Sequence, residues 1–352
     1  MKIHIPAEYD GRLLRSYLKL TLGLSTAVLA KLKNNDRGIL VNGQRVTVRY
    51  VLHTGDVLEL SDRDTAATAS EHVIPADLPL DVLYEDDHVI ALNKPPHMPT
   101  HPSHGHVDDT LANALAYRYA RAAEPFVFRP LGRLDRNTSG VVIAGKTRAA
   151  SGCLSRSLKA GDVSKCYVAL LVGEMGDVGV PHTVTAPIYR PEMSGIRRAV
   201  GDETIPGCVH AETRYMVLAS QNGHSLVLCQ PFTGRTHQLR VHFSHLGFPI
   251  LGDDLYGTPS SLMDRHALHA ISLGVPLPFF GFGHTDGAVT PLDTPQSCSN
   301  GSPNTPDCNG YLRTWAPLPA DMRSALTLIF GKDAPTLTFE RVVTLQQELT
   351  GS

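Results

Sequence analysis

At residues 132–140 the chain reads Gly132-Arg133-Leu134-Asp135-Arg136-Asn137-Thr138-Ser139-Gly140, an acid between two arginines followed by a Thr-Ser-Gly turn. The apolar run directly after it, residues 141–144, predicts a short buried strand. Asp135 should therefore lie on a loop that enters a strand, where a scaffold can hold a side chain at the wall of a cleft. A fixed, ionised carboxylate can act as a nucleophile or as a base. The structural alternative is that Asp135 caps the turn and pairs with Arg133 or Arg136.

Size and composition bound the class of protein. The chain has 352 residues, 42% of them hydrophobic, which favours about two domains with packed cores. No apolar run approaches the roughly 20 residues of a membrane span, so we expect no membrane partner. Residues 1–6 contain no apolar signal core, and we therefore expect a cytoplasmic protein.

The six cysteines are scattered, and no Cys-x-x-Cys occurs. Buried free thiols are the simplest interpretation, and neither a disulfide framework nor a structural zinc site is expected. Cys298 and Cys308 together with His284 match no standard zinc spacing. We therefore predict that the protein has no metal site.

The N-terminal residues 1–62 have the pattern of a small α+β unit. Residues 11–33 show helix-like apolar spacing in two pieces, with Ser25 placed to cap the second. Residues 38–46 read as strand, Asn-Gly turn and strand, which is the strongest short hairpin signal, and a further strand is expected at 57–60.

The same residues carry nine Lys/Arg against six Asp/Glu, a net charge of +3. Two short basic helices followed by a small hairpin resemble the S-four-like RNA-binding module, named after a small-subunit ribosomal protein. The resemblance implies that basic side chains here contact RNA, and we select as candidates Arg12, Arg15, Lys31, Lys33 and Arg45. The alternative is an ordinary α+β unit with solvated basic faces.

Residues 63–79 are polar and rich in Ala, Thr and Ser, which predicts a flexible linker. From residue 80 to 330 many short strands alternate with few helices, at 109–122 and 149–159. This mixture predicts an α+β catalytic domain with a large, mixed, mainly antiparallel sheet and a central cleft, followed by a C-terminal tail, 331–352. Within it, residues 276–312 are dominated by Pro, Gly, Ser, Thr and Asn and are interpreted as a flexible surface insertion.

Two further segments carry side chains suited to chemistry. Residues 165–173 alternate like a strand and contain Tyr167, whose ring can stack on a base and whose hydroxyl can take part in proton transfer. The structural alternative is a half-buried strand tyrosine. Residues 234–242 read Gly-Arg-Thr-His-Gln-Leu-Arg-Val-His and place Arg235, His237 and Arg240 on one turn-plus-helix segment. Because no carboxylate separates its two histidines, a zinc hydrolase is disfavoured.

Together the three segments resemble the RluA-type pseudouridine synthase family. The family motifs are His-Arg-Leu-Asp-x-x-Thr-Ser-Gly, Lys-x-Tyr-x-Ala and Gly-Arg-x-His-Gln-(Ile/Leu)-Arg-x-His, and they occur here in the same order. The chain departs from them at Gly132, which stands where the family has His. The resemblance implies that Asp135 is the catalytic nucleophile, that Tyr167 lies in the active site and that Arg240 pairs with Asp135. It also implies framework or RNA-binding roles for Arg133, Arg235 and His237.

The implied reaction converts uridine in structured RNA to pseudouridine. It needs no cofactor, which suits a chain without a Walker loop or a dinucleotide fingerprint. We expect ribosomal RNA of the large subunit as partner, with transfer RNA as the other possibility, and a monomeric protein. Two alternatives stay open: a catalytically silent RNA-binding ribosome-assembly factor of the same fold, and a metal hydrolase. The resemblance leaves open whether the nucleophile attacks the sugar or the base.

Overall fold

The computed structural model describes residues 2–61, 73–192, 195–202, 204–277, 302–307 and 310–350. The predicted linker, 63–79, is therefore described only from residue 73 onward. Likewise, His284, Cys298 and Cys308 lie outside the described residues, so the prediction that they hold no metal stays a prediction.

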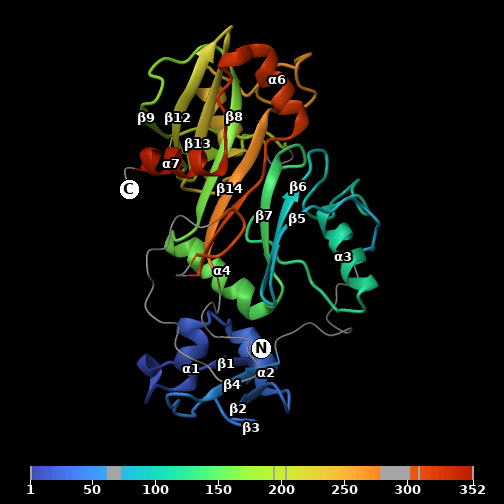
Figure 1. Cartoon of the computed structure of the whole chain (residues 1–352), viewed down its shortest axis with the longest axis vertical. Helices are drawn as coiled ribbons and strands as arrows, with labels where there is room; N and C mark the ends of the chain where they lie inside the picture. Colours follow the sequence, from blue (N-terminus) through green and yellow to red (C-terminus); the bar gives the residue numbers. More distant parts are fainter. Residues whose placement is uncertain are drawn as a thin grey trace.

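The N-terminal residues form a small antiparallel sheet with two helical segments, as the sequence predicts (Figure 1). The strand order is β1-β4-β2-β3. Ser25 caps the second helix, accepting a hydrogen bond from the Val28 amide at 3.2 Å. Asn42 and Gly43 both have positive φ, 52° and 77°, as a two-residue hairpin turn requires. The elements are β1 (Lys2–His4), α1 (Leu14–Ser16), a π-helical turn (Tyr17–Thr21), α2 (Thr26–Lys33), β2 (Ile39–Val41), β3 (Gln44–Arg45) and β4 (Val57–Leu60).

A nine-stranded sheet forms the body of the molecule, in the order β5-β6-β7-β14-β8-β13-β12-β9 with β15 paired to β14. All of its pairs are antiparallel except β14 with β7, so the predicted mainly antiparallel α+β fold is confirmed. Its strands are β5 (Val82–Glu85), β6 (Val89–Lys94), β7 (Ser139–Gly145), β8 (Ser164–Val172), β9 (Pro181–Thr185), β12 (Glu212–Gln221), β13 (His224–Pro231), β14 (Leu268–Pro276) and β15 (Tyr311–Trp315). A separate short hairpin joins β10 (Ile188–Tyr189) to β11 (Ala199–Val200).

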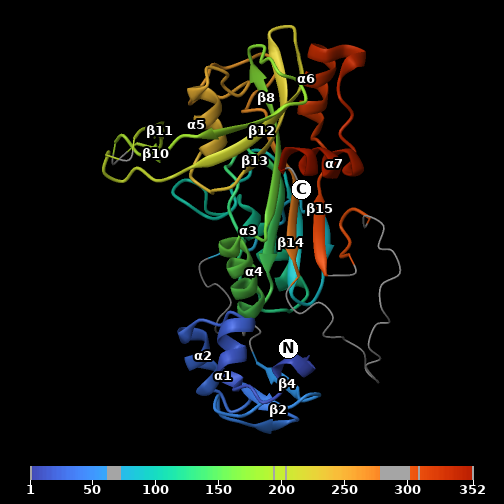
Figure 2. The same cartoon turned by 90° about the vertical axis from the view of Figure 1, so that its left-hand side faces the viewer.

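Helices cover both faces of the upper part of this sheet. Helix α5 (Gln238–His245) and the β10–β11 hairpin lie on one face, and α6 (Ala320–Phe330) and α7 (Phe339–Thr350) lie on the other (Figure 2). Helix α7 falls within the segment interpreted from sequence as a tail. It packs Val342, Leu345 and Leu349 into the main core, because its apolar residues recur at helical spacing.

Local capping explains where the other two helices begin. Thr110 and Asn113 form a reciprocal capping box at the start of α3 (Leu111–Arg121). Thr147 accepts a hydrogen bond from the Ala150 amide at 3.1 Å at the start of α4 (Arg148–Ala160). Gly161 ends α4 in the left-handed conformation, with φ 86°. Both helices match the predicted ranges to within a few residues.

The predicted insertion joins two strands of one hairpin. Strands β14 and β15 pair up to Pro276 and Tyr311, so the two ends of the segment are adjacent. The described residues 302–307 pack beside β15: the Asn304 side chain accepts from the Trp315 amide at 2.8 Å. Residues 278–301 and 308–309 lie outside the described residues.

The N-terminal unit contacts the body of the molecule through α4. Ala149 and Ala150 of α4 are buried in the apolar cluster of the N-terminal unit. The Cys153 thiol donates to the Leu22 carbonyl at 3.1 Å, and Gly152 lies against Gly23, where an added Cβ would be 2.9 Å from the Gly23 oxygen. Absence of a side chain at Gly152 therefore permits the close approach.

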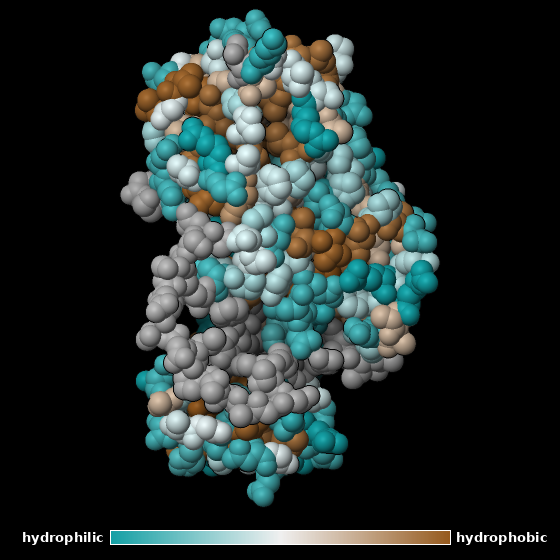
Figure 3. All heavy atoms as spheres, viewed as in Figure 1, coloured by the Kyte–Doolittle hydropathy of each residue, from teal (hydrophilic) through white to brown (hydrophobic). Residues whose placement is uncertain are grey.

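Apolar residues on the face shown in Figure 3 gather in separate patches among polar ones. Among the helices that the structure describes, none has the length and apolar character needed to cross a bilayer.

We predict that Gly152→Leu loosens the contact between the N-terminal unit and α4, because the side chain would overlap backbone of residue 23. Amide hydrogen exchange should then speed up in residues 14–33 and in α4, while the large sheet keeps its protection. Gly176→Leu is the matched control, since an added Cβ there meets nothing within 4 Å. Unchanged exchange in residues 14–33 would show that the contact contributes nothing to their stability.

Candidate active site

A cavity of about 420 Å³ lies between the loop 131–138, strand β8 and the segment 231–240. All six candidate residues that the sequence places in the catalytic domain line this cavity: Arg133, Asp135, Tyr167, Arg235, His237 and Arg240. They come from three segments that are far apart in the sequence. The structure thus brings together the three motifs on which the sequence prediction depends.

Asp135 faces two cationic or titratable groups across the cavity. Its Oδ2 lies 3.6 Å from Arg240 Nη1 and 3.9 Å from His237 Nε2. Within the described part of the chain, Arg133 and Arg136 form no ion pair with Asp135, and Arg136 instead donates to the His97 carbonyl at 3.3 Å. The structural alternative, in which Asp135 pairs with a flanking arginine, is therefore wrong.

Arg240 makes its bidentate pair with Asp253, not with Asp135. Its Nε and Nη2 donate to the two Asp253 oxygens at 2.7 and 2.8 Å, and the Asp253 carboxylate is fully buried. Burial disfavours the charged guanidinium, but the hydrogen bonds and charge of Asp253 more than offset it and raise the pKa of Arg240. A bidentate pair with Asp135 is thus excluded, because Asp253 already occupies the fork of the guanidinium and leaves only Nη1 for Asp135.

The two histidines of the third motif have different surroundings. His237 has a left-handed backbone, with φ 58°, and its Nδ1 is 2.8 Å from the Tyr256 hydroxyl. His242 is fully buried and lies 3.0 Å from both the Thr213 hydroxyl and the Ala186 carbonyl. Burial lowers the pKa of both rings. His242 is therefore a framework residue. Within the part of the chain that the structure describes, no three His, Cys, Asp or Glu side chains gather into a possible metal site.

Tyr167 lies on β8, beside Asp135. Burial, followed by the negative charge of Asp135, raises the pKa of its hydroxyl well above the usual value. The hydroxyl is therefore protonated at neutral pH and is a hydrogen-bond donor, not a base. Tyr167 lines the cavity.

Buried donors hold the backbone of the loop that carries Asp135. The Thr100 hydroxyl donates to the Leu134 carbonyl at 2.9 Å, Lys94 Nζ to the Arg136 carbonyl at 3.1 Å, and Arg265 Nη1 to the Asn137 carbonyl at 2.8 Å. Lys94 and Arg265 are both almost completely buried. None of these three residues was predicted from the sequence, because their roles depend on contacts between distant segments.

Arg265 also connects this loop to α6. Its Nε and Nη2 donate to Asp321 at 2.7 and 3.1 Å, and Asp321 lies in the first turn of α6. Next to it, His266 Nε2 is 2.8 Å from the Thr138 hydroxyl. Burial lowers the pKa of His266 to about 3, so the ring stays neutral.

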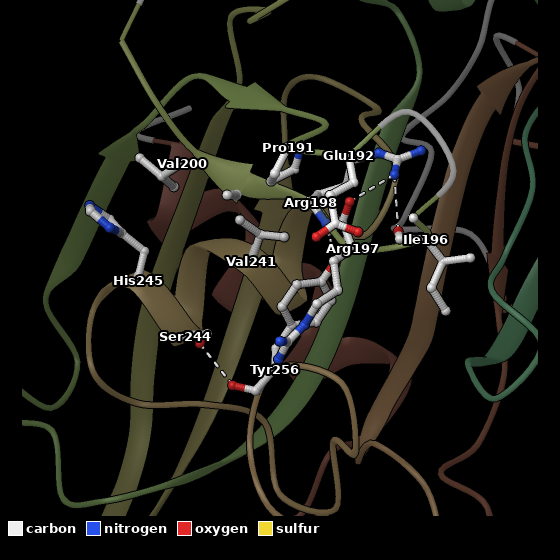
Figure 4. A pocket seen from close by; sticks show the side chains of 12 residues that line it. Pro191, Glu192, Ile196, Arg197, Arg198, Val200, Val241, Ser244, His245 and Tyr256 are labelled. Atoms are coloured by element: carbon white, nitrogen blue, oxygen red, sulfur yellow. Dashed lines mark hydrogen bonds between the residues drawn. The ribbon is translucent and has the colours of Figure 1, made fainter. Parts of the chain in front are cut away.

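Figure 4 shows the residues that line a second cavity, of about 540 Å³. Arg197 and Arg198 line it together with Val241 and His245 of α5. Tyr256 also lines this second cavity: its hydroxyl accepts from the Arg198 amide at 2.8 Å and contacts His237, which lines the first cavity. This cavity was not predicted from the sequence, because its walls combine residues 191–200 with α5 and Tyr256, which are distant in the chain.

The five N-terminal candidates lie on the surface and none of them lines the cavity. Arg45 forms an exposed ion pair with Asp36 at 2.6 Å and donates to the Lys33 carbonyl. Arg12 lies over the Tyr9 ring at 5.6 Å. For these residues, RNA binding stays a prediction.

Comparisons with known proteins agree with this geometry. Residues 88–245, which include Asp135, Tyr167 and Arg240, match the family described as RNA pseudouridylate synthase. The RNA pseudouridine synthase YjbO of Bacillus subtilis is 37% identical over 249 residues, which cover 71% of this chain and 85% of that protein. The chain belongs to the RluA-type family of RNA pseudouridine synthases.

Other relatives of this synthase extend the comparison. Ribosomal large subunit pseudouridine synthase D of Xanthomonas campestris is 35% identical over 268 residues, covering 72% of this chain and 78% of the relative. The solved structure of human RNA pseudouridylate synthase domain containing 4 is 23% identical, with a TM-score of 0.50 over 70% of this chain and 91% of that chain, and shares the fold. The protein is thus an enzyme that isomerises uridine in RNA.

We predict that Arg240→Met destabilises the synthase by about 3 kcal/mol or more, because Asp253 would be left as a buried, unpaired charge. Activity should fall strongly as well, since Asp135 loses its nearest cation. Asp253→Asn should cost less activity than Arg240→Met, because it keeps the guanidinium beside Asp135. Denaturant unfolding and initial rates measure the two effects. Arg235→Met is the stability control: the side chain is exposed, and a change beyond about 0.5 kcal/mol would contradict this assignment.

The pH dependence of stability should report on Lys94. Burial lowers the pKa of Lys94 to about 7 in the folded protein, against about 10.4 when unfolded. The unfolded chain then binds more protons between these values, so this group makes the free energy of unfolding rise with pH from 7 to 10. Lys94→Met should remove that contribution to the slope, while Lys332→Met, on an exposed lysine, should keep it. Identical slopes in wild type and Lys94→Met would contradict the prediction.

Proposed function

We propose that this synthase acts on ribosomal RNA of the large subunit and that Asp135 is its nucleophile. Relatives named ribosomal large subunit pseudouridine synthase D support the choice of RNA. The observation that carries the second part is the position of Asp135, 3.6 Å from Arg240 and beside Tyr167 in one cavity.

The reaction breaks the bond from uracil N1 to ribose C1′, turns the base over and joins its C5 to C1′. The proton on C5 is lost and N1 gains one, so no electrons are transferred and no group leaves. Because C5 and C1′ are shielded in a stacked helix, the target nucleotide must leave the stack and enter the cavity. Asp135 then attacks either the sugar or the base, with its charge stabilised by Arg240.

The role that we propose for Tyr167 is to stack on the detached base while it turns. The raised pKa of its hydroxyl disfavours a role as the base that removes the C5 proton. A protonated hydroxyl can instead donate a hydrogen bond to the base. This argument favours stacking and orientation over proton abstraction.

RNA outside the cavity needs contacts of its own. Arg133 is exposed at the cavity, and Arg235 is exposed on its other side, so both are available to phosphates. We propose that residues 1–62 form the S-four-like module and that Arg12, Arg15, Lys31 and Lys33 add further phosphate contacts. Arg45 is the weakest of the five candidates, because Asp36 already neutralises it. We also propose that the protein acts as a monomer.

The alternative function, a silent ribosome-assembly factor, is not favoured by any specific observation. Its only support is Gly132 in place of histidine. Gly132 is exposed, and an added Cβ there would meet nothing within 4 Å, so the site tolerates either residue sterically.

We predict that Asp135→Asn abolishes turnover while leaving the fold intact, because it removes the nucleophile and keeps the shape of the side chain. Release of tritium from RNA labelled at uridine C5 measures turnover, and circular dichroism checks the fold. Asp162→Asn, at an exposed position two residues after the end of α4, is the control and should keep full activity. Turnover by Asp135→Asn above a few percent of wild type would remove Asp135 as the nucleophile.

The choice of RNA has a separate test. Pseudouridine should be mapped in ribosomal and transfer RNA from cells with and without the gene. We expect sites in large-subunit ribosomal RNA to disappear without it. Loss of sites from transfer RNA alone would replace the proposed substrate while leaving the reaction unchanged.

A further inference from the structure

Lys165 is a cation in the same cavity as Tyr167, and no group among the residues that the structure describes neutralises it. It lies on β8 two residues before Tyr167, so both side chains leave the strand on the same face, and both line the cavity. Lys165 is half-buried, yet its ammonium has no hydrogen bond and no ion pair with any residue that the structure describes. Asp135 lines the same cavity, but its carboxylate lies 3.6 Å from Arg240.

The unpaired ammonium of Lys165 destabilises the folded protein when no ligand is bound. Removing an ammonium from water disfavours its charged form, and burial accordingly lowers the pKa of Lys165. The two other buried cations of this region differ, because Lys94 and Arg265 donate to several backbone carbonyls. Lys165 has no such acceptor among the described residues, so no hydrogen bond within this part of the protein stabilises its charged form.

The position of Lys165 also indicates where its ligand would lie. A Cβ built on Gly234 would be 3.9 Å from Lys165 Nζ, and Gly234 is exposed, as are its neighbours Phe232 and Arg235. Arg240 and Leu268, in contrast, are buried at the far side of the cavity. The ammonium therefore lies beside the exposed segment 232–235, in the same cavity as Tyr167 and Asp135.

We propose that Lys165 binds a backbone phosphate of the RNA strand next to the target uridine. This rests on the proposed function, in which a nucleotide enters the cavity with its base inward. Its phosphate then stays near the exposed segment 232–235, beside the unpaired ammonium. A phosphate provides the acceptors that the protein does not, and a charge-assisted contact offsets the desolvation of the lysine.

The test compares Lys165→Met with Lys165→Arg and with the exposed-lysine control Lys332→Met, in the full chain. Removing an unpaired, desolvated charge should raise the melting temperature of Lys165→Met by a few degrees. The same variant should bind a labelled short oligouridine about tenfold more weakly, with a salt slope flatter by slightly less than one. On active RNA, KM should rise and kcat should change much less. Lys165→Arg should restore affinity in part, and Lys332→Met should match wild type throughout.

Neutral methylphosphonate linkages locate the contact. When one phosphate next to a central uridine is replaced by methylphosphonate, wild type should bind this RNA more weakly than unmodified RNA. Lys165→Met should bind the two RNAs almost equally, because it already lacks the contact. A lower melting temperature with unchanged affinity would show that Lys165 is structural and would overturn the proposal. A loss of kcat alone, with the same affinity and salt slope, would assign Lys165 to the base instead. The binding and stability measurements need no turnover, so failure of the proposed function on any RNA would be seen separately.

Discussion

The active site depends on how the backbone of the loop 131–138 is held. Three backbone carbonyl groups of this loop accept hydrogen bonds from buried donors. Thr100 donates to the carbonyl of residue 134, Lys94 to that of residue 136 and Arg265 to that of residue 137. Two of these donors are charged and almost fully buried, which would be very unfavourable without acceptors. The loop therefore supplies what the cations need, and the cations fix the loop. A carboxylate on such a rigid backbone keeps its direction without being pinned by a neighbour.

Because the backbone is held in this way, the Asp135 carboxylate needs no bidentate partner, and its oxygens stay accessible from the cavity. A bidentate arginine pair would hold it more tightly but would also engage both of its oxygens. Asp253 makes the bidentate pair instead: it accepts from Nε and Nη2 of Arg240, and Nη1 then lies 3.6 Å from Asp135. The guanidinium thus provides charge without occupying the carboxylate. This buried ion pair therefore orients the Arg240 guanidinium toward Asp135.

Sequence reasoning succeeded where the signal was local. The Asn-Gly hairpin, the Ser25 cap and strand β8 were expected from short patterns. The approach of the three motifs to one cavity was expected from the resemblance to the family. It did not find Asp253, Arg265 or the second cavity, because their roles come from contacts between distant segments. Arg265 and Asp321 are 56 positions apart, and nothing in either neighbourhood announces a buried pair. The helical order of α7 was also missed, since it depends on a sheet face that only the folded chain provides.

The comparison of buried cations separates framework from ligand binding. Lys94 has three carbonyl acceptors, matching the three hydrogens of an ammonium, and Arg265 satisfies its guanidinium with Asp321 and loop carbonyls. The hydrogen bonds of both side chains are made within the protein, without any substrate. Both residues therefore have a structural role. Lys165 is half-buried and has no acceptor among the residues that the structure describes. The proposed phosphate contact supplies that acceptor, so the role that we propose for Lys165, unlike those of Lys94 and Arg265, depends on bound RNA.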